Sequence, residues 1–412
     1  MQPSKLISRR TVLAAGGAGT IAALAAPSGV AGAAATRVDP VLEWYDLTAS
    51  TIGVITGPQQ VTSSRAWAVA WIAAWRAVTA TRSELALAGA VHEALVTLYP
   101  AAAPTLDAAL AAAVARTGGR HAGRAVAAGV EAARAVLAER TGDGLDLASV
   151  NRPFTPPPAA PGVWQPTPPA FAAPVQSGQG DGRPFLVHDV EPLLPGPPPA
   201  LNSAVFLRDL AESRAVGAAG SSIRTPAQTA VARFWSQTSL NGFTGALRTT
   251  LAPHGSHAAD RRPLERRIGL VALFHAATID AQITTYRAKY RYLFWRPVTA
   301  IRTGAVAPDP AWTPLITTPA HPEYPSGHTT YAGAAQAVLD TLAGAPRAPF
   351  TLTSAAAADV TLRYSAWSEL TRDNINARVW EGVHFRHTDE IGAAVGRRAA
   401  LAALGRWHGR PV

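Results

Sequence analysis

Three separate stretches of the sequence carry residues whose types and spacing could do chemistry on an anion. In chain order these residues are Lys289 and Arg296, then Ser326, Gly327 and His328, and finally Arg378 and His384. Together they supply three cations, a hydroxyl donor and two histidines, a set suited to a phosphate-shaped anion. We therefore expect the three stretches to meet in one anion-binding pocket.

The first stretch places two cations seven residues apart. At about 100° per residue, Lys289 and Arg296 would lie almost in line on a helix, two turns apart. Cations with this spacing are also common on solvated helix faces. Four of the six intervening residues are aromatic, which indicates a buried surface rather than a solvated one.

The second stretch, Pro325 to His328, precedes an Ala-rich segment and predicts the start of a helix. Free backbone N–H groups and the helix dipole make such a start a natural anion site, and Gly327 lets the backbone approach closely. Ser326 adds a hydroxyl and His328 a titratable group. Ser and Gly also serve as ordinary helix caps, so these four residues alone are only moderately specific.

The third stretch runs from Arg378 to the predicted start of the last helix. Thr388 is a good N-cap residue and is followed by acids in the first turn, including Asp389. His384 would then lie in a short connection after Gly382, where its side chain can point into a pocket. A single histidine in such a place is more often structural than catalytic.

The elements that must position these residues are predicted to be mainly α-helical. Alanine is abundant, aromatics make up 7% of the 412 residues, and β-branched runs are short. Trp67, Trp71 and Trp75 recur every four residues, which predicts a buried helix face over 61–80. Further helices are expected at the following ranges: 84–98, 105–115, 122–139, 201–216, 226–237 and 265–295, the last ended by Pro297.

Residues 151–200 are rich in Pro and Gly and cannot form regular helix. They could be a flexible linker, but Trp164, Phe171 and Phe185 favour an ordered segment wrapped on the core. We therefore expect one helical domain over 36–412. N-terminal helices would occupy 36–150, and a catalytic helical bundle would occupy 201–412.

Residues 1–35 are predicted to be a twin-arginine export signal that is removed. Arg9 and Arg10 precede an apolar stretch, and a small-residue cleavage site follows at 31–33. We therefore expect secretion to the extracellular space or the cell envelope. No other stretch is apolar for the roughly 18 residues that a membrane span requires.

Composition narrows the chemistry further. The chain has no cysteine, which excludes disulfides, thiolate metal sites and cysteine nucleophiles. Its formal net charge is +10, with 37 Lys and Arg against 27 Asp and Glu, which would suit an anionic ligand. No long basic run indicates nucleic-acid binding.

The order and spacing of the three stretches resemble the signature of the type 2 phosphatidic acid phosphatase superfamily, which includes the vanadium-dependent haloperoxidases. The stretches 289–302 and 321–328 resemble the haloperoxidase branch. The stretches 164–169, 224–228 and 234–235 are similar to secreted bacterial haloperoxidase-like proteins. The resemblance implies the helical bundle of the vanadium haloperoxidase and acid phosphatase type.

The resemblance also implies a role for each site residue. Vanadate would be the cofactor, its oxygens held by Lys289, Arg296, Ser326, the Gly327 N–H and Arg378. His384 would bind the vanadium, and His328 would act as acid and base. Hydrogen peroxide, a halide and a small organic acceptor would be the reactants, and a homodimer is suggested.

Two other functions stay open at this point. In an acid phosphatase on the same scaffold, His384 would attack phosphorus and become a phosphohistidine. The electrostatic demands are alike, because vanadate on an axial nitrogen mimics the five-coordinate phosphoryl transition state. A weakly active anion-binding relic of the family is the third hypothesis.

Some positions either refine this hypothesis or depart from the family pattern. His321 implies a preference for bromide, although it could equally cap or orient its loop. Glu381 replaces a small or apolar residue, and we expect it to point outwards. The acid after His384 comes one residue late as Asp389, so Asp389, His387, Glu390 or a backbone carbonyl could orient His384. The carboxylate that tunes His328 is left open between Asp280 and Glu323.

Overall fold

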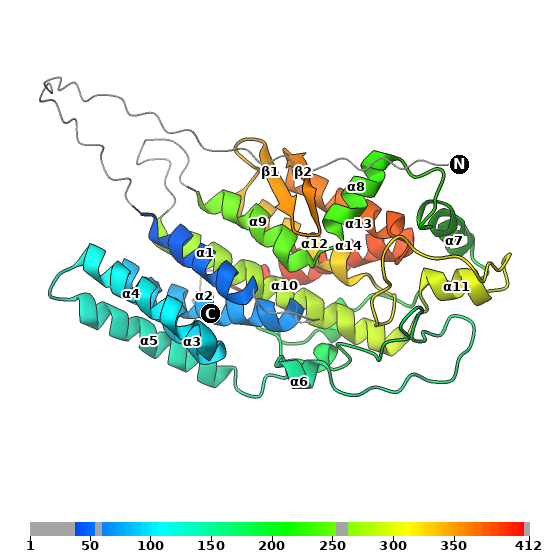
Figure 1. The fold of residues 1–412 in the computed structure, drawn as a ribbon. Helices are drawn as coiled ribbons and strands as arrows, with labels where there is room; N and C mark the ends of the chain where they lie inside the picture. Colours follow the sequence, from blue (N-terminus) through cyan, green and yellow to red (C-terminus); the bar gives the residue numbers. More distant parts are fainter. Residues whose placement is uncertain (1–37, 54–59, 253–262, 408–412) are drawn as a thin grey trace, which may run out of the picture. The chain divides into compact units, whose positions relative to one another are not determined.

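The computed structural model describes residues 38–53, 60–252 and 263–407, and Figure 1 draws the rest as a grey trace. Asp39–Val412 form one compact unit. Its described part is mainly helical, as the sequence predicts. The export signal expected at residues 1–35 lies outside the described residues.

The N-terminal part is a group of packed helices. They are α1 (Pro40–Gly53), α2 (Gln60–Thr81), α3 (Glu84–Leu98), α4 (Ala103–Thr117) and α5 (Ala122–Glu139). The three tryptophans of α2 are buried, as predicted. Trp67 stacks on His275 of the central helix with ring centroids 4.6 Å apart. This stacking joins the N-terminal helices to the core of the C-terminal bundle.

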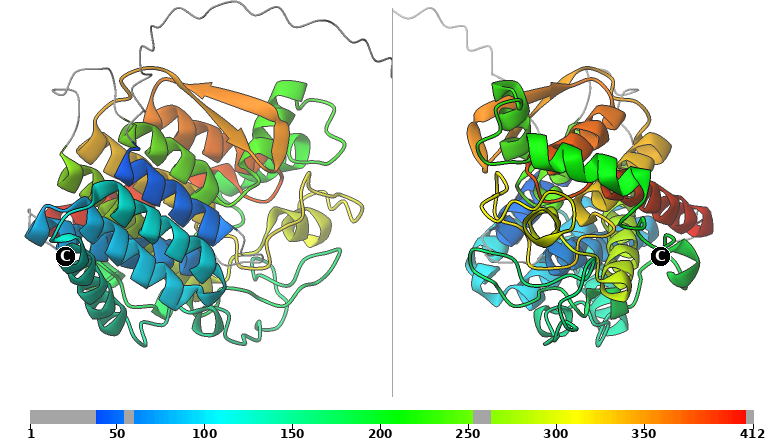
Figure 2. Two further views of the ribbon diagram at one scale, coloured as in Figure 1. Left: turned by 60° about the vertical axis from the view of Figure 1, so that its left-hand side comes forward. Right: turned by 90° about the vertical axis from the view of Figure 1, so that its right-hand side faces the viewer.

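The C-terminal bundle is built from the remaining helices. They are α7 (Ala204–Val216), α8 (Pro226–Trp235), α9 (Ser239–Leu251), α10 (Leu264–Tyr292), α11 (Pro297–Thr303), α12 (Gly327–Val338), α13 (Trp367–Trp380) and α14 (Arg386–Trp407). Thr225 caps α8 through a capping box, as its sequence predicts. An antiparallel hairpin, β1 (Phe350–Ser354) with β2 (Ala357–Tyr364), was not predicted. It lies beside α8 and α9, as Figure 2 shows.

Helix α10 is the central element and packs against α2, α12 and α14. By length and composition it is long and apolar enough to cross a membrane, but its apolar window is completely buried inside the protein. Helices α12 and α14 also approach very closely. A Cβ on Gly333 would lie 2.1 Å from the Ala393 carbonyl oxygen, and one on Gly396 would lie 1.9 Å from that of Thr330. These glycines fix the spacing of the two helices whose N-termini face the candidate site.

Helix α10 ends earlier than expected. Leu293 adopts the left-handed conformation, with φ of 48°, and its N–H bonds to the Lys289 carbonyl. The neighbouring chain holds this break, because the Trp164 N–H donates to the Leu293 carbonyl at 2.7 Å. The prediction that Pro297 ends the helix was therefore wrong. Lys289 and Arg296 are not in line on one helix, since Arg296 is the N-cap of α11.

The Pro-rich segment is an ordered chain with short helical turns. Its sequence favoured such an ordered segment over a flexible linker. Helix α6 (Leu147–Val150) precedes the segment, which contains 3-10 turns at Gln179–Asp181 and Glu191–Leu193. The buried Asp280 carboxylate of α10 accepts the backbone N–H groups of Phe185, Leu186 and Val187 at 2.6, 2.8 and 2.8 Å. Burial raises the pKa of Asp280 to about 6, while these hydrogen bonds oppose the shift. The carboxylate ties the segment to the core.

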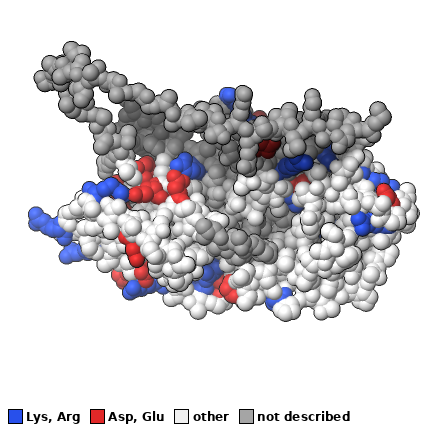
Figure 3. Space-filling model, in the orientation of Figure 1, with Lys and Arg blue, Asp and Glu red and all other residues white. Residues whose placement is uncertain are grey.

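Charges of both signs are interspersed over the face of the molecule drawn in Figure 3. Several charges of the protein are paired, for example Arg248 with Asp46 at 2.6 Å. The cations of the predicted site are instead buried, with Lys289 and Arg296 each 0% exposed. The positive charge that matters for an anion site therefore lies inside the protein.

Replacing Asp280 by Asn should lower the free energy of unfolding by about 3 kcal/mol, because the amide leaves at least one buried N–H donor without an acceptor. Urea denaturation at pH 7.5 measures this difference. Asp359→Asn on the exposed face of β2 removes the same charge and should change the stability little. Equal stabilities of the two variants would show that Asp280 does not anchor the Pro-rich segment.

Candidate oxyanion-binding site

The sequence-predicted residues all lie at or next to helix ends. Lys289 is in the last turn of α10, Arg296 caps α11, Ser326 caps α12, Arg378 is in the last turn of α13, and His384 precedes α14. All five are at most 1% exposed. Gly327 and His328 form the first turn of α12, and His328 is half-buried. The break at Leu293 and the turn after Trp380 bring the cations to the start of α12.

His384 is held by a carboxylate that sequence reasoning did not assign to it. Its Nδ1 lies 2.7 Å from Oε1 of Glu323, which also accepts the Phe385 N–H at 3.0 Å and the Thr388 hydroxyl. Asp389 therefore does not orient His384 in this structure. With Nδ1–H donated to Glu323, the tautomer that this hydrogen bond implies leaves the Nε2 lone pair as an acceptor, and Arg296 Nη1 lies 3.0 Å from it.

Asp280 and Glu323, the two carboxylates that could have tuned His328, both form hydrogen bonds with other groups. Glu323 binds His384, and Asp280 accepts backbone N–H groups from the Pro-rich segment. His328 Nε2 lies instead 3.1 Å from the Gln237 carbonyl oxygen. Burial, followed by the charge of Arg378, lowers the pKa of His328 well below its usual range. A neutral imidazole that donates Nε2–H to Gln237 keeps Nδ1 available to accept a proton.

Thr388 also departs from its predicted role. Helix α14 begins at Arg386, so Thr388 lies inside its first turn instead of capping it. Its hydroxyl donates to the Glu323 carboxylate and lies 2.7 Å from the Phe385 carbonyl oxygen. The residue thus supports the carboxylate that holds His384.

Arg296 joins three parts of the site. Its guanidinium donates to the carbonyls of His321 and Val383 at 3.0 and 2.8 Å, and its Nη1 lies 3.0 Å from His384 Nε2. Its Nη2 lies 3.1 Å from His321 Nδ1, and His321 packs against Tyr286 with ring centroids 5.3 Å apart. His321 therefore lies beside the site and also supports the guanidinium.

Lys289 contacts the same loop from the end of α10. Its ammonium donates to the carbonyls of Pro322 and Glu323, both at 2.8 Å, which uses two of its three N–H groups. Burial and then the charge of Arg296 lower the pKa of Lys289 well below its usual range. A bound anion nearby would oppose both effects.

Glu381 does not point outwards, so that expectation was wrong. It is 0% exposed and forms an ion pair with Arg378. Gly382, with φ of 75°, turns the chain here, and a Cβ on it would lie 2.4 Å from the Gly217 carbonyl oxygen. This packing directs Glu381 inwards. Burial raises the pKa of Glu381 to about 7, and Arg378 partly offsets the shift.

The donors left over fit an oxyanion such as vanadate or phosphate. Among the described residues, Arg378 Nε has no hydrogen-bond partner, although it is buried. The Ser326 hydroxyl forms no hydrogen bond of regular geometry. Burial raises the pKa of nearby Asp389, and the Ser326 hydroxyl partly offsets this shift. The first N–H groups of α12 have no acceptor within the helix. A tetrahedral anion would satisfy donors of this kind.

Comparisons with known proteins agree with this arrangement. Residues 269–409, which include every predicted site residue, match the family model for the VCPO second helical-bundle domain. The vanadium chloroperoxidase of Curvularia inaequalis is 36% identical over 77 residues, a stretch that covers 16% of this chain and 13% of that protein. The resemblance to the vanadium haloperoxidases is thus confirmed in the C-terminal part of the chain.

Two solved structures extend the comparison to most of the chain. A bacterial vanadium-dependent iodoperoxidase superposes with a TM-score of 0.72 at 22% identity and covers 89% of this chain and 95% of its own. An apo-type bacterial vanadium-dependent chloroperoxidase gives 0.66 at 17% identity and covers 85% and 96%. The fold is therefore the helical vanadium haloperoxidase fold, as predicted.

Replacing Glu381 by Gln should strengthen the binding of sulfate, an anion that does not titrate in this range. An ionised Glu381 competes for Arg378 above its pKa of about 7, whereas below that pH the carboxyl is protonated and releases the guanidinium. The variant should therefore bind about tenfold more tightly at pH 8 and nearly equally at pH 6. Isothermal titration calorimetry at both values checks this.

The matched control for this measurement is Glu131→Gln, which removes an exposed carboxylate on α5 and should bind sulfate as the wild type does. A gain in the Glu381 variant of the same size at both pH values, or no gain, would contradict competition for Arg378.

Proposed function

We propose that this chain, which resembles the vanadium haloperoxidases in sequence and fold, is a vanadate-dependent haloperoxidase. It oxidises a halide, with bromide favoured, by hydrogen peroxide and thereby halogenates a small organic acceptor. The observation that carries this proposal is the pairing of His384 with Glu323, which presents Nε2 beside Arg296. A neutral imidazole fixed by a carboxylate is a typical ligand for a transition metal.

The residues of the chain supply the electrostatic part of the reaction. Lys289, Arg296 and Arg378 neutralise the oxygens of the anion, and the start of α12 adds N–H donors. When bound, vanadate would supply a Lewis-acidic centre that activates peroxide towards the halide. His328 would take up and return the proton at Nδ1, since burial keeps its imidazole neutral at pH 7.

Bromide is favoured by the resemblance carried by His321. The contacts of His321 also fit a role in holding Arg296, because its Nδ1 lies 3.1 Å from the guanidinium. The solved relatives are described as an iodoperoxidase and a chloroperoxidase, so the fold serves more than one halide. The proposal for bromide therefore rests on one side chain.

A soluble acid phosphatase is the second candidate, because the same cations would stabilise a phosphoryl transition state. In that reaction His384 Nε2 is the nucleophile and forms a phosphohistidine. Neither function requires a different residue at the site. The two differ in their response to vanadate, which should activate a haloperoxidase and inhibit a phosphatase.

The setting of the enzyme is also a proposal. The twin-arginine pattern supports export to the extracellular space or the cell envelope, by a route that moves folded proteins. A homodimer is proposed on the family resemblance alone. Mass spectrometry of the N-terminus of the exported protein, followed by light scattering, would test both.

Purified metal-free protein should oxidise bromide with peroxide only after vanadate is added, and the same addition should not reveal phosphatase activity. His384→Ala should reduce the bromide turnover by at least about a hundredfold, since the anion loses its only imidazole ligand. Bromination of a dye and hydrolysis of a phosphate ester, each with and without vanadate, measure this. His92→Ala, outside the site, is the matched control.

Two results would contradict the haloperoxidase proposal. One is phosphatase activity that vanadate inhibits, without any bromide oxidation. The other is full bromide turnover in the folded His384→Ala variant, which would move the reaction to another residue.

A further inference from the structure

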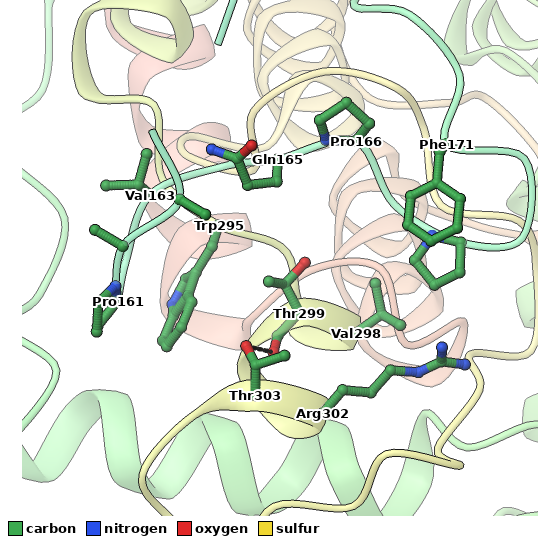
Figure 4. Close-up of a pocket in the computed structure, with 13 residues that line it drawn as sticks. Pro161, Val163, Gln165, Pro166, Phe171, Trp295, Val298, Thr299, Arg302 and Thr303 are labelled. Carbon is green, nitrogen blue, oxygen red and sulfur yellow. Dashed lines mark hydrogen bonds between the residues drawn. The ribbon is translucent and has the colours of Figure 1, made fainter. Parts of the chain in front are cut away.

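A pocket of about 500 Å³ lies between residues 159–171 of the Pro-rich segment and helix α11, as Figure 4 shows. Most of its walls are apolar, with Pro161, Val163 and Val298 among the lining residues. This volume is in the range of sites that bury a small organic molecule, roughly 300 to 1,000 Å³. The pocket is separate from the predicted oxyanion contacts, since none of the seven site residues lines it.

Arg302 is a charged group in the pocket wall and is suited to a ligand with an acceptor. Trp295 contributes its ring to the wall at the other end, while its indole nitrogen is buried. Arg302 donates from Nε to the Trp312 carbonyl at 2.7 Å, which orients its guanidinium in the pocket wall. Its charge would favour an anionic group on the ligand.

Phe171 is an unusual residue at the same pocket. It is 63% exposed, and its φ of 47° lies in the left-handed region, which is rare for a large side chain. Strained conformations of this kind cluster at ligand-binding sites. In Figure 4 the Phe171 ring and Arg302 lie towards one end of the pocket and the Trp295 indole towards the other. An aromatic ligand would cover the exposed ring of Phe171.

The pocket is also tied to the oxyanion site through the backbone. The backbone N–H of Trp295 donates to the Gly162 carbonyl at 2.9 Å, and Val163 forms an isolated β-bridge with Phe294. Arg296 follows directly and caps α11, which forms one side of the pocket. The same short stretch of chain therefore carries a pocket residue and an oxyanion-site cation.

We propose that this pocket binds a planar aromatic carboxylate, with its ring against Phe171 and the apolar walls and its carboxylate facing Arg302. The apolar walls match the ring, and the guanidinium of Arg302 matches the carboxylate. That such a molecule is the acceptor for halogenation rests on the proposed function. Its binding does not.

Calorimetric titration of the full chain with naphthoate tests the binding, with sulfate present to occupy the oxyanion site. We expect one saturable site. Arg302→Met should weaken it at least about tenfold, because a charged hydrogen bond is lost. Neutral naphthylmethanol should bind the wild type as weakly as naphthoate binds the Arg302 variant.

Arg363→Met is the matched control, since it removes an exposed arginine on β2 and should bind naphthoate like the wild type. Thermal unfolding shows whether each variant is folded. The pocket assignment is overturned if folded Arg302→Met binds naphthoate normally. It is also overturned if sulfate displaces naphthoate or if Arg378→Ala abolishes its binding, because the ligand would then occupy the oxyanion site.

The failure of this proposal is distinguishable from failure of the proposed function. Naphthoate binding that depends on Arg302, in a protein that oxidises no halide, would support the pocket and refute the haloperoxidase. Bromide oxidation without any naphthoate binding would support the haloperoxidase and refute the pocket.

Discussion

Three cations buried close together are the constraint around which the site is arranged. Lys289, Arg296 and Arg378 are at most 1% exposed, and their charges raise the energy of one another's charged forms. Removing such groups from water is costly unless opposite charges and hydrogen bonds compensate. In the structure the compensation comes from backbone carbonyls, from Glu381 and from the Glu323 carboxylate. An oxyanion would supply the missing negative charge at the place where the cations converge.

The chain meets this constraint by ending its helices at the site. Helix α10 ends in a left-handed residue just after Lys289, and α13 ends just after Arg378, while α12 begins at Gly327. Helix ends offer free carbonyls and free N–H groups, so they can hold cations and an anion together. The close packing of α12 on α14 at Gly333 fixes where the N-terminus of α12 lies relative to that of α14.

The sequence was sufficient for features that depend on local chemistry. The ends of several helices, the buried tryptophans and the start of α12 after Ser326 follow from periodicity and local residue types. Features that depend on contacts distant in the sequence were missed. Glu323 binds His384 across 61 residues. Leu293 breaks α10 because Trp164 holds its carbonyl, and Glu381 turns inwards because Gly217 packs on Gly382. No local pattern reports these contacts.

The function of this site depends on one anion bound jointly by the three cations and faced by His384. The most direct measurement is a crystal structure of the protein soaked with vanadate. We expect density for one anion in contact with Lys289, Arg296, Ser326 and Arg378, with His384 Nε2 as its only protein ligand on the metal and Glu381 displaced from Arg378. An anion bound elsewhere, with the ion pair between Arg378 and Glu381 intact, would contradict joint binding by the three cations.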